Sequence, residues 1–217
     1  MTKILLTRHG HVPGIEPERF RGREPLDLTE RGRAQAAAVA HRIADSFRVR
    51  KIYTSPMGRC VETGAAIAKA SGAPAEVCDD LNDIDYGAWQ FKTLASAKKA
   101  DPDLFAAWFA TPQLVRFPNG ESLQDVAARA ANALRFVLAR HPRDTIVLVG
   151  HDSFNRALLL QLLGLSLSAY RRLAQSPCCL NEIDMDGGSV CIVRLNETHH
   201  LDALGAPAAA RRQLKSA

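Results

Sequence analysis

The sequence predicts an α/β protein, a three-layer α/β/α sandwich whose mostly parallel sheet has an antiparallel edge. Short apolar segments typical of buried strands alternate along the chain with longer segments that repeat apolar residues at helical spacing. This alternation favours parallel strands with helices on both faces of the sheet. Near the C-terminus, two apolar segments flank Asp186-Gly187-Gly188, a pattern typical of a β-hairpin. The hairpin would supply the antiparallel edge.

The composition is that of a globular protein with one domain. The chain has 217 residues, of which 47% are hydrophobic and 24% charged. No repeat or linker divides it, so we predict a single domain over residues 1–204 and a loose Ala- and Arg-rich tail over residues 205–217. No apolar run approaches the roughly 20 residues that cross a bilayer, and the N-terminus does not resemble a secretory signal.

Cysteines and charge narrow the functional classes. Five cysteines with no Cys-x-x-Cys pair predict reduced thiols in a cytoplasmic protein, with neither a disulfide framework nor a zinc site. The net charge is +5, but the basic residues are scattered among acidic ones. We therefore expect small anionic substrates, and neither nucleic acid nor a membrane as a partner.

The first half of the chain begins with an apolar strand over residues 4–6, which leads into Arg8 and His9. A loop rich in Pro and Gly follows over residues 11–28, and Thr29 is expected to cap a helix that continues to about residue 47.

A second strand is predicted over residues 51–54. Ser55 is then expected to cap a helix that carries Pro56 in its first turn and is closed by Gly72. Residues 76–78 form a short third strand.

The middle of the chain starts with an acidic, irregular segment over residues 79–93 and one or two short helices over residues 93–110. Ser122 and Asp125 then form a capping box at the start of the longest helix.

The second half contains the strongest strand, residues 145–149, which ends in Gly-His-Asp. Ser153 is expected to cap the next helix, over residues 154–163, and the hairpin strands occupy residues 179–185 and 189–195.

Charged and imidazole side chains follow three of the predicted strands. Arg8 and His9 follow the first strand, Arg59 the second, and His151 the strongest. Parallel strands end at the same edge of a sheet, where open α/β sheets build their sites. Guanidinium groups fork onto phosphoryl oxygens and an imidazole nitrogen can attack phosphorus, so this grouping predicts a phosphoryl site.

The order and spacing of short motifs from residue 4 to about residue 195 resemble those of the histidine phosphatase superfamily, which has the phosphoglycerate mutase-like fold. The resemblance rests on Thr7-Arg8-His9-Gly10, Phe20-Arg21-Gly22, Leu28-Thr29, the segment 32–36, the segment 55–63 from Ser55 to Thr63, the acidic block 81–89 from Leu81 to Trp89, Asn119-Gly120-Glu121-Ser122 and Val149-Gly150-His151.

The resemblance implies roles for the strand-end residues. His9 is the nucleophile that becomes phosphohistidine, and Arg8, Arg59 and His151 hold the phosphoryl oxygens. The neighbouring arginines disfavour the protonated imidazole, and a hydrogen bond to a carbonyl near Gly10 would fix its tautomer. No metal or other cofactor is required, because the arginines supply the positive charge.

The proton donor differs from the family pattern. Relatives normally place Glu two residues after the Leu of the acidic block, where this chain has Asp83. Asp reaches roughly 1.5 Å less far, which matters because hydrogen-bond reach is only about 2.6–3.2 Å. We favour Asp83 as general acid and then as base for water, with Asp85 or Glu121 as alternatives.

A second departure lies in the loop after the first strand. Many relatives have an Asn there that contacts phosphate, and this chain has none. Arg21, with Gly22 in the same motif, or backbone N–H groups near Gly14 are expected to replace it. Whether His11 faces substrate or solvent is left open.

These observations favour a metal-independent phosphatase that hydrolyses a small phosphorylated metabolite through phosphohistidine. The alternatives are a phosphoglycerate mutase with the same catalytic residues and, in another class, a catalytically weak regulatory domain that binds phosphoryl groups. The mutase is less favoured because the insertion at residues 93–118 is short. A homodimer is left open, because the apolar pair Trp108-Phe109 would either form an interface or cover the site.

Overall fold

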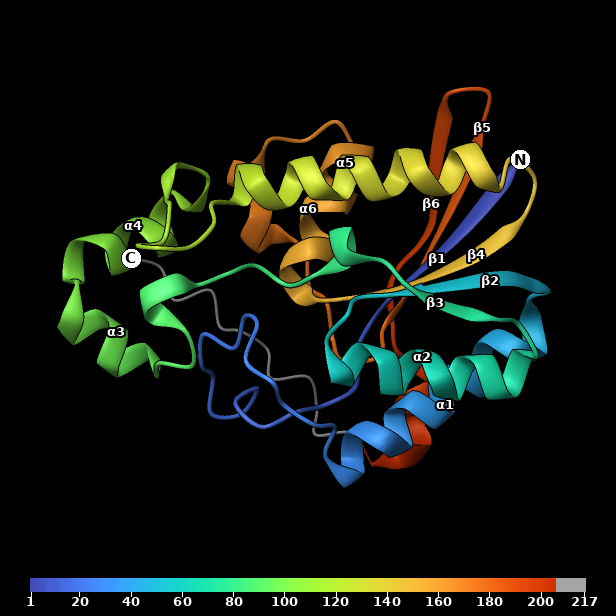
Figure 1. Cartoon of the computed structure of the whole chain (residues 1–217), viewed down its shortest axis with the longest axis horizontal. Helices are drawn as coiled ribbons and strands as arrows, with labels where there is room; N and C mark the ends of the chain where they lie inside the picture. Colours follow the sequence, from blue (N-terminus) through green and yellow to red (C-terminus); the bar gives the residue numbers. More distant parts are fainter. Residues whose placement is uncertain (206–217) are drawn as a thin grey trace.

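A computed structural model describes residues 1–205 as a six-stranded sheet in the order β3-β2-β4-β1-β5-β6, covered on both faces by helices (Figure 1). The first four strands along the chain pair in parallel, and β5 and β6 pair antiparallel at one side. The predicted fold class is therefore confirmed. The strands are β1 (Thr2–Arg8), β2 (Val49–Thr54), β3 (Ala75–Val77), β4 (Thr145–Gly150), β5 (Leu180–Asp186) and β6 (Ser189–Glu197).

The helices form the two outer layers. One layer consists of α1 (Glu30–Ser46) and α2 (Gly58–Ser71), and the other of α5 (Leu123–Arg140) and α6 (Asp152–Leu162). Two short helices, α3 (Leu94–Ala100) and α4 (Pro102–Ala110), lie beyond the edge of the sheet where β1 ends (Figure 1). The short 3₁₀ helices are η1 (Asp79–Leu81), η2 (Gly87–Trp89), η3 (Pro112–Leu114), η4 (Leu167–Arg172) and η5 (His199–Leu204).

The central strands are apolar on both faces, which explains their near-continuous hydrophobic runs. In β1, Ile4 and Leu6 pack into the core beneath α5 and α6, whereas Leu5 packs into the core beneath α1 and α2. All three side chains are fully buried. Within residues 1–205, no helix combines the length and the apolarity that a membrane crossing requires.

Two of the four predicted helix caps are confirmed and two are wrong. Thr29 caps α1 by accepting a hydrogen bond from a backbone N–H, and Ser122 caps α5 in a reciprocal capping box with Asp125. In contrast, α2 begins after Met57, beyond both Ser55 and Pro56.

Ser55 lies two residues before the N-cap position at Met57; its backbone N–H donates to Val149 O of β4, and its hydroxyl is hydrogen-bonded to Nε2 of His151. Ser153 is not a cap either. Its helix begins at Asp152 directly after β4, so Ser153 lies inside the first turn, where its hydroxyl accepts a hydrogen bond from Tyr170.

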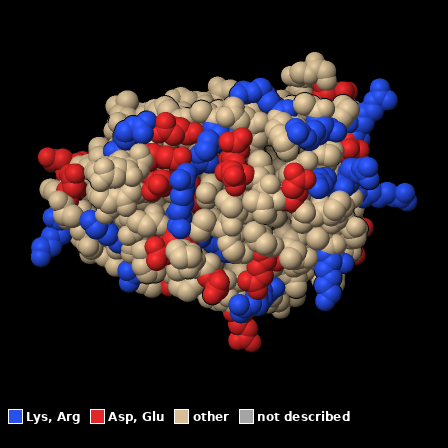
Figure 2. Space-filling view, in the orientation of Figure 1, with Lys and Arg blue, Asp and Glu red and all other residues tan. Residues whose placement is uncertain are grey.

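The loop over residues 11–28 contains no helix and packs against the middle of the chain, through backbone hydrogen bonds between Phe20 and residues 91–92, a bridge between Arg19 and Thr93, and the Phe20 ring, which lies against Trp89. The predicted tail over residues 205–217 lies outside the described residues, apart from Gly205 at the end of η5. Figure 2 shows acidic and basic side chains interspersed over one face of the molecule.

Candidate active site

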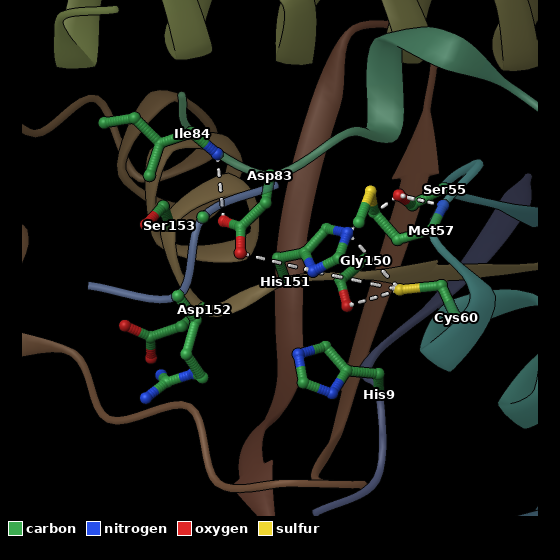
Figure 3. A network of polar contacts seen from close by, with 12 residues as sticks. His9, Ser55, Met57, Cys60, Asp83, Ile84, Gly150, His151, Asp152 and Ser153 are labelled. Carbon is green, nitrogen blue, oxygen red and sulfur yellow. Dashed lines mark hydrogen bonds and ion pairs between the residues drawn. The ribbon is translucent and has the colours of Figure 1, made fainter. Parts of the chain in front are cut away.

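The ends of three parallel strands bring the predicted residues together. Arg8 is the last residue of β1 and pairs in register with Gly150, the last residue of β4. His9 and His151 therefore follow neighbouring strands, and their ring centroids lie 5.2 Å apart in an edge-to-face arrangement. Figure 3 shows the Asp83 carboxylate pointing toward His151 and the His9 ring lying beside it.

The His9 ring is held in one tautomer by its own backbone. Its Nδ1 lies 2.7 Å from the carbonyl oxygen of Gly10 and donates to it, which leaves Nε2 with a lone pair. Burial, followed by the positive charge of Arg59, holds the His9 pKa well below its ordinary value. Gly10 permits this geometry, since a Cβ there would lie 2.4 Å from the carbonyl oxygen of Gly32. His9 is therefore neutral, with a fixed and unprotonated Nε2.

The Arg8 guanidinium is buried and only partly satisfied. Its Nη1 donates to the Gln175 carbonyl at 2.6 Å and lies 3.7 Å from the Asp152 carboxylate. Its Nε and Nη2 are buried and have no hydrogen-bond partner among the described residues. Buried unpaired donors carry a desolvation penalty that an anion removes by accepting from them. Arg8 is thus suited to hold an anionic group beside His9.

Arg59 comes from the first turn of α2 and is fully buried. Its Nη2 donates to the Gly22 carbonyl at 2.6 Å and lies 3.2 Å from the Asp83 carboxylate. Gly22 adopts a φ of 45°, and a Cβ on it would lie 2.8 Å from the Ile84 carbonyl oxygen, so only glycine fits this tight passage. Gly22 therefore acts through its carbonyl group, which positions Arg59.

His151 is fixed by partners on both ring nitrogens. Its Nε2 lies 2.7 Å from the Ser55 hydroxyl, and its Nδ1 lies 3.3 Å from Nη2 of Arg59. Burial, followed by Arg59, lowers the pKa of His151 well below its ordinary value, so the ring is neutral. Since the guanidinium can only donate, Nδ1 is the unprotonated nitrogen and Nε2–H donates to Ser55.

Asp83 is the carboxylate that contacts Arg59 and His151. Its Oδ2 lies 3.2 Å from Arg59 and 3.4 Å from Nδ1 of His151, and its Oδ1 accepts from the Ile84 N–H at 2.9 Å. Burial raises the pKa of Asp83 above its ordinary value, although Arg59 and Arg21 act in the opposite direction. The geometry and the pKa direction together suit a proton donor.

The two alternative carboxylates lie elsewhere. Asp85 accepts a hydrogen bond from the Gly87 N–H and pairs with Arg23, and Glu121 pairs with Arg23 and Arg129. Neither side chain lines the cleft that His9 borders.

That cleft encloses about 560 Å³ of empty space, including open solvent at its mouth. Arg8, His9, Arg21, Gly22 and Asp83 line it, whereas the fully buried Arg59 and His151 lie behind its wall. The rest of the lining comes from the 11–28 loop, the residue before η2, α3, α4, η4 and the start of α6, namely Glu18, Arg19, Phe20, Tyr86, Leu94, Trp108, Phe109, Asp152, Ser153, Arg156, Tyr170 and Arg171.

Of the two groups expected to replace the missing Asn, Arg21 lines the cleft and the backbone near Gly14 does not. Arg21 lines the cleft, and its guanidinium donates to the carbonyls of Gly14 and Arg19. Gly14 itself does not line the cleft, so its backbone serves to hold Arg21. His11 is half-buried and its Nδ1 is hydrogen-bonded to the Thr29 hydroxyl at 3.0 Å, away from the cleft lining.

Sequence reasoning missed the buried Arg156, whose guanidinium lies 3.0 Å from Asp152 one helical turn earlier. The spacing of these two residues directly after His151 was a usable signal, because positions i and i+4 share one helix face. Trp108 and Phe109, for which an interface was left open, line the cleft. Within residues 1–205, no group of three or more His, Cys, Asp or Glu side chains is placed to hold a metal ion.

Comparisons with known proteins agree with this arrangement. The sequence profile of the histidine phosphatase superfamily (branch 1) matches residues 4–198. Phosphoserine phosphatase 1 of Hydrogenobacter thermophilus is 32% identical over 201 residues, which cover 93% of this chain and 95% of that protein. A probable phosphoglycerate mutase, GpmB of Cronobacter sakazakii, is 29% identical over 94% of this chain and 96% of its own length. Among solved structures, YhfR of Bacillus stearothermophilus is 27% identical and superposes with a TM-score of 0.87, covering 93% of this chain and all of that one.

Proposed function

Because the chain belongs to the histidine phosphatase superfamily, we propose that it is a phosphoric monoester hydrolase that acts on small phosphorylated metabolites through a phosphohistidine on His9. The observation that carries the proposal is the neutral His9 ring, whose free Nε2 borders the same cleft as the partly unpaired guanidinium of Arg8. A nucleophile and an unsatisfied cation in one cleft suit attack on a phosphoryl group.

In the first step, Nε2 of His9 forms a bond to phosphorus as the ester P–O bond breaks. Asp83 gives its proton to the departing alkoxide and becomes a carboxylate. Arg8 and Arg21 hold the phosphoryl oxygens from the cleft, whereas Arg59 and His151, which were expected to hold them too, lie behind its wall and contact Asp83. The arginines supply the positive charge that a metal ion would otherwise provide, so the reaction needs no metal.

In the second step, a water molecule attacks phosphorus and the N–P bond breaks. The Asp83 carboxylate takes a proton from that water, which regenerates the acid and leaves inorganic phosphate and neutral His9. Burial helps in both steps, because a raised pKa keeps the carboxyl group protonated before the first step and makes the carboxylate a stronger base in the second.

The cleft also suggests the kind of substrate. Its lining combines several guanidinium groups with the aromatic side chains of Tyr86, Trp108, Phe109 and Tyr170, which suits a compact phosphate ester. Because one relative is named a phosphoserine phosphatase, O-phosphoserine belongs in the first set of compounds tested. We place the enzyme in the cytoplasm, since its five cysteines form no disulfide within residues 1–205.

The proposal is tested with the purified protein and an aryl phosphate in the presence of EDTA. We expect phosphate release, and we expect His9→Ala to lower it by about 10⁴-fold or more, because the variant lacks the nitrogen that forms the phosphoenzyme. Acid-labile, alkali-stable labelling of the wild-type enzyme by radioactive substrate would identify phosphohistidine. Activity that survives His9→Ala, or that requires added Mg²⁺, would contradict the mechanism.

One relative is named a mutase, so the same experiment includes phosphoglycerates with a bisphosphate primer. Isomerisation without phosphate release would favour the mutase alternative. Phosphate binding with no turnover of any ester would favour a regulatory domain.

A further inference from the structure

We propose that Arg129, on α5, is a positioning residue that clamps the backbone of residues 80–83 and so sets the reach of Asp83. The inference rests on the proposed function, because it concerns the proton donor of that reaction. It also accounts for a departure from the family pattern: an aspartate, one methylene shorter than the usual glutamate, serves where the loop that carries it is held close to the site.

Three backbone carbonyls of the acidic loop converge on one guanidinium. Nη1 of Arg129 donates to the carbonyls of Asp80 at 2.9 Å and Asn82 at 3.0 Å. Its Nη2 lies 3.4 Å from the carbonyl of Asp83 itself. Residues 80–83 lie in η1 and directly after it, and the backbone hydrogen bonds donated by their N–H groups, from Leu81 to Cys78 and from Asn82 to Asp79, are local.

Glu121 holds the clamp in place. Its two carboxylate oxygens accept from Nε of Arg129 at 3.1 Å and from Nη2 at 3.0 Å, a bidentate pair. One of these oxygens also accepts from the Asp85 N–H at 3.0 Å, and the other from Arg23 at 3.0 Å. The clamp therefore binds the loop on both sides of Asp83, at residues 80–82 and at Asp85.

Arg129 binds the backbone of Asp83, on the side of the residue opposite to its reactive carboxyl group. The Asp83 carbonyl faces Arg129 and Arg23, whose Nε donates to it at 3.2 Å, while the Asp83 carboxylate faces Arg59 and His151. Arg129 does not line the cleft and cannot touch substrate there. Its hydrogen bonds act on the reaction through Asp83, while burial and several positive charges, its own among them, lower the pKa of His151.

Arginine is required for this geometry. The planar guanidinium carries five N–H donors in a fixed fork, and here they meet three carbonyls and a carboxylate at once. A lysine would keep the charge beside Glu121 but would offer one mobile ammonium group, and a glutamine would lose the charge as well.

The test compares Arg129→Gln and Arg129→Lys with the wild type and with Arg135→Gln. Arg135 is exposed on the same helix and donates a hydrogen bond to Asn132 one turn earlier, so its replacement is a matched control. For each protein, kcat/KM is measured for an alkyl phosphate and for an aryl phosphate with a good leaving group, together with inhibition by inorganic phosphate and the melting temperature.

We expect Arg129→Gln to lower kcat/KM for the alkyl ester by about 10- to 100-fold and for the activated aryl ester by no more than about threefold, because only the poor leaving group depends on a well-placed acid. Phosphate inhibition should stay within about threefold, and Arg129→Lys should fall between Arg129→Gln and the wild type. Arg135→Gln should match the wild type.

If a folded Arg129 variant loses kcat/KM equally for both esters, or loses none, the proposed role of Arg129 is refuted. If Arg129→Gln does not fold, Arg129→Lys is judged by the same criterion. If the wild type hydrolyses neither ester, the proposed function fails and a second readout decides the clamp alone. This readout is the ¹³C NMR titration of the Asp83 carboxyl, which should move toward the ordinary aspartate pKa in the Arg129 variants; an unchanged titration overturns the clamp.

Discussion

Asp83→Asn separates the proton-donor role of this residue from its structural role. Asparagine has nearly the same shape, so its amide oxygen can still accept from the Ile84 N–H that Oδ1 binds at 2.9 Å. Arg59 keeps the carbonyls of Gly22 and Glu24 as partners, which preserves its position. What the variant loses is the carboxyl group that gives a proton in the first step and then, as a carboxylate 3.2 Å from Arg59, takes one in the second.

The size of the effect follows from the leaving group. A positioned general acid contributes about 10²–10⁴-fold to rate, or about 2.7–5.5 kcal/mol at 1.36 kcal/mol per tenfold. We therefore expect kcat/KM for an alkyl phosphate to fall by at least 10²-fold. For an aryl phosphate whose leaving group departs unprotonated, we expect a fall of less than tenfold.

The assay measures kcat/KM because this parameter reports only the steps up to departure of the alcohol. Asp83 is also the proposed base for water, so the variant should release one equivalent of an activated phenol rapidly and then turn over slowly. Above the pKa of Asp83, where the wild-type carboxylate is charged, inorganic phosphate should bind the variant at least as tightly as the wild type, because a negative charge beside Arg59 has been removed.

Equal losses of kcat/KM for alkyl and aryl esters would refute the acid role. Weaker phosphate binding would refute the electrostatic part of the reasoning, since it would mean that the substitution had disturbed the anion site itself.

Two further predictions follow from the same network. First, kcat/KM for an alkyl ester should have a bell-shaped pH profile. It falls in acid as His9 becomes protonated at its lowered pKa, and it falls at higher pH as Asp83 loses its proton at a pKa above the ordinary aspartate value. Asp83→Asn should therefore flatten the alkaline limb of the profile. An unchanged alkaline limb in that variant would assign the limb to another group. Second, Ser55→Ala should lower kcat/KM about tenfold without changing the fold seen by circular dichroism, because Nε2–H of His151 loses its buried acceptor at 2.7 Å, a loss worth about 1–3 kcal/mol. A fully active Ser55→Ala enzyme would show that His151 does not need this partner.

Local sequence was sufficient for the framework of the site. Apolar periodicity identified the strands, and parallel strands end at one edge, so the grouping of Arg8, His9, Arg59 and His151 followed from their places after strands. The hydrogen bond from His9 to the adjacent Gly10 carbonyl was also predictable, because it joins neighbours in the chain.

Contacts between distant residues were not predictable in this way. Ser55 was expected to cap a helix, yet it binds His151, 96 residues away. The choice of Asp83 over Asp85 and Glu121 depended on which carboxylate the folded loop turns toward the cleft, and the loop is held by Arg129 from 46 residues farther along.

The sequence by itself determined the order of strands and helices and which residues follow each strand, since these depend on local pattern and on the geometry of a parallel sheet. Only the tertiary structure decided how the loops lie over that edge. Loop positions depend on side-chain partners such as Arg129 with Glu121 and Arg59 with Gly22, whose separation along the chain leaves no periodic signal. The catalytic framework is thus local in origin, and the placement of its proton donor is not.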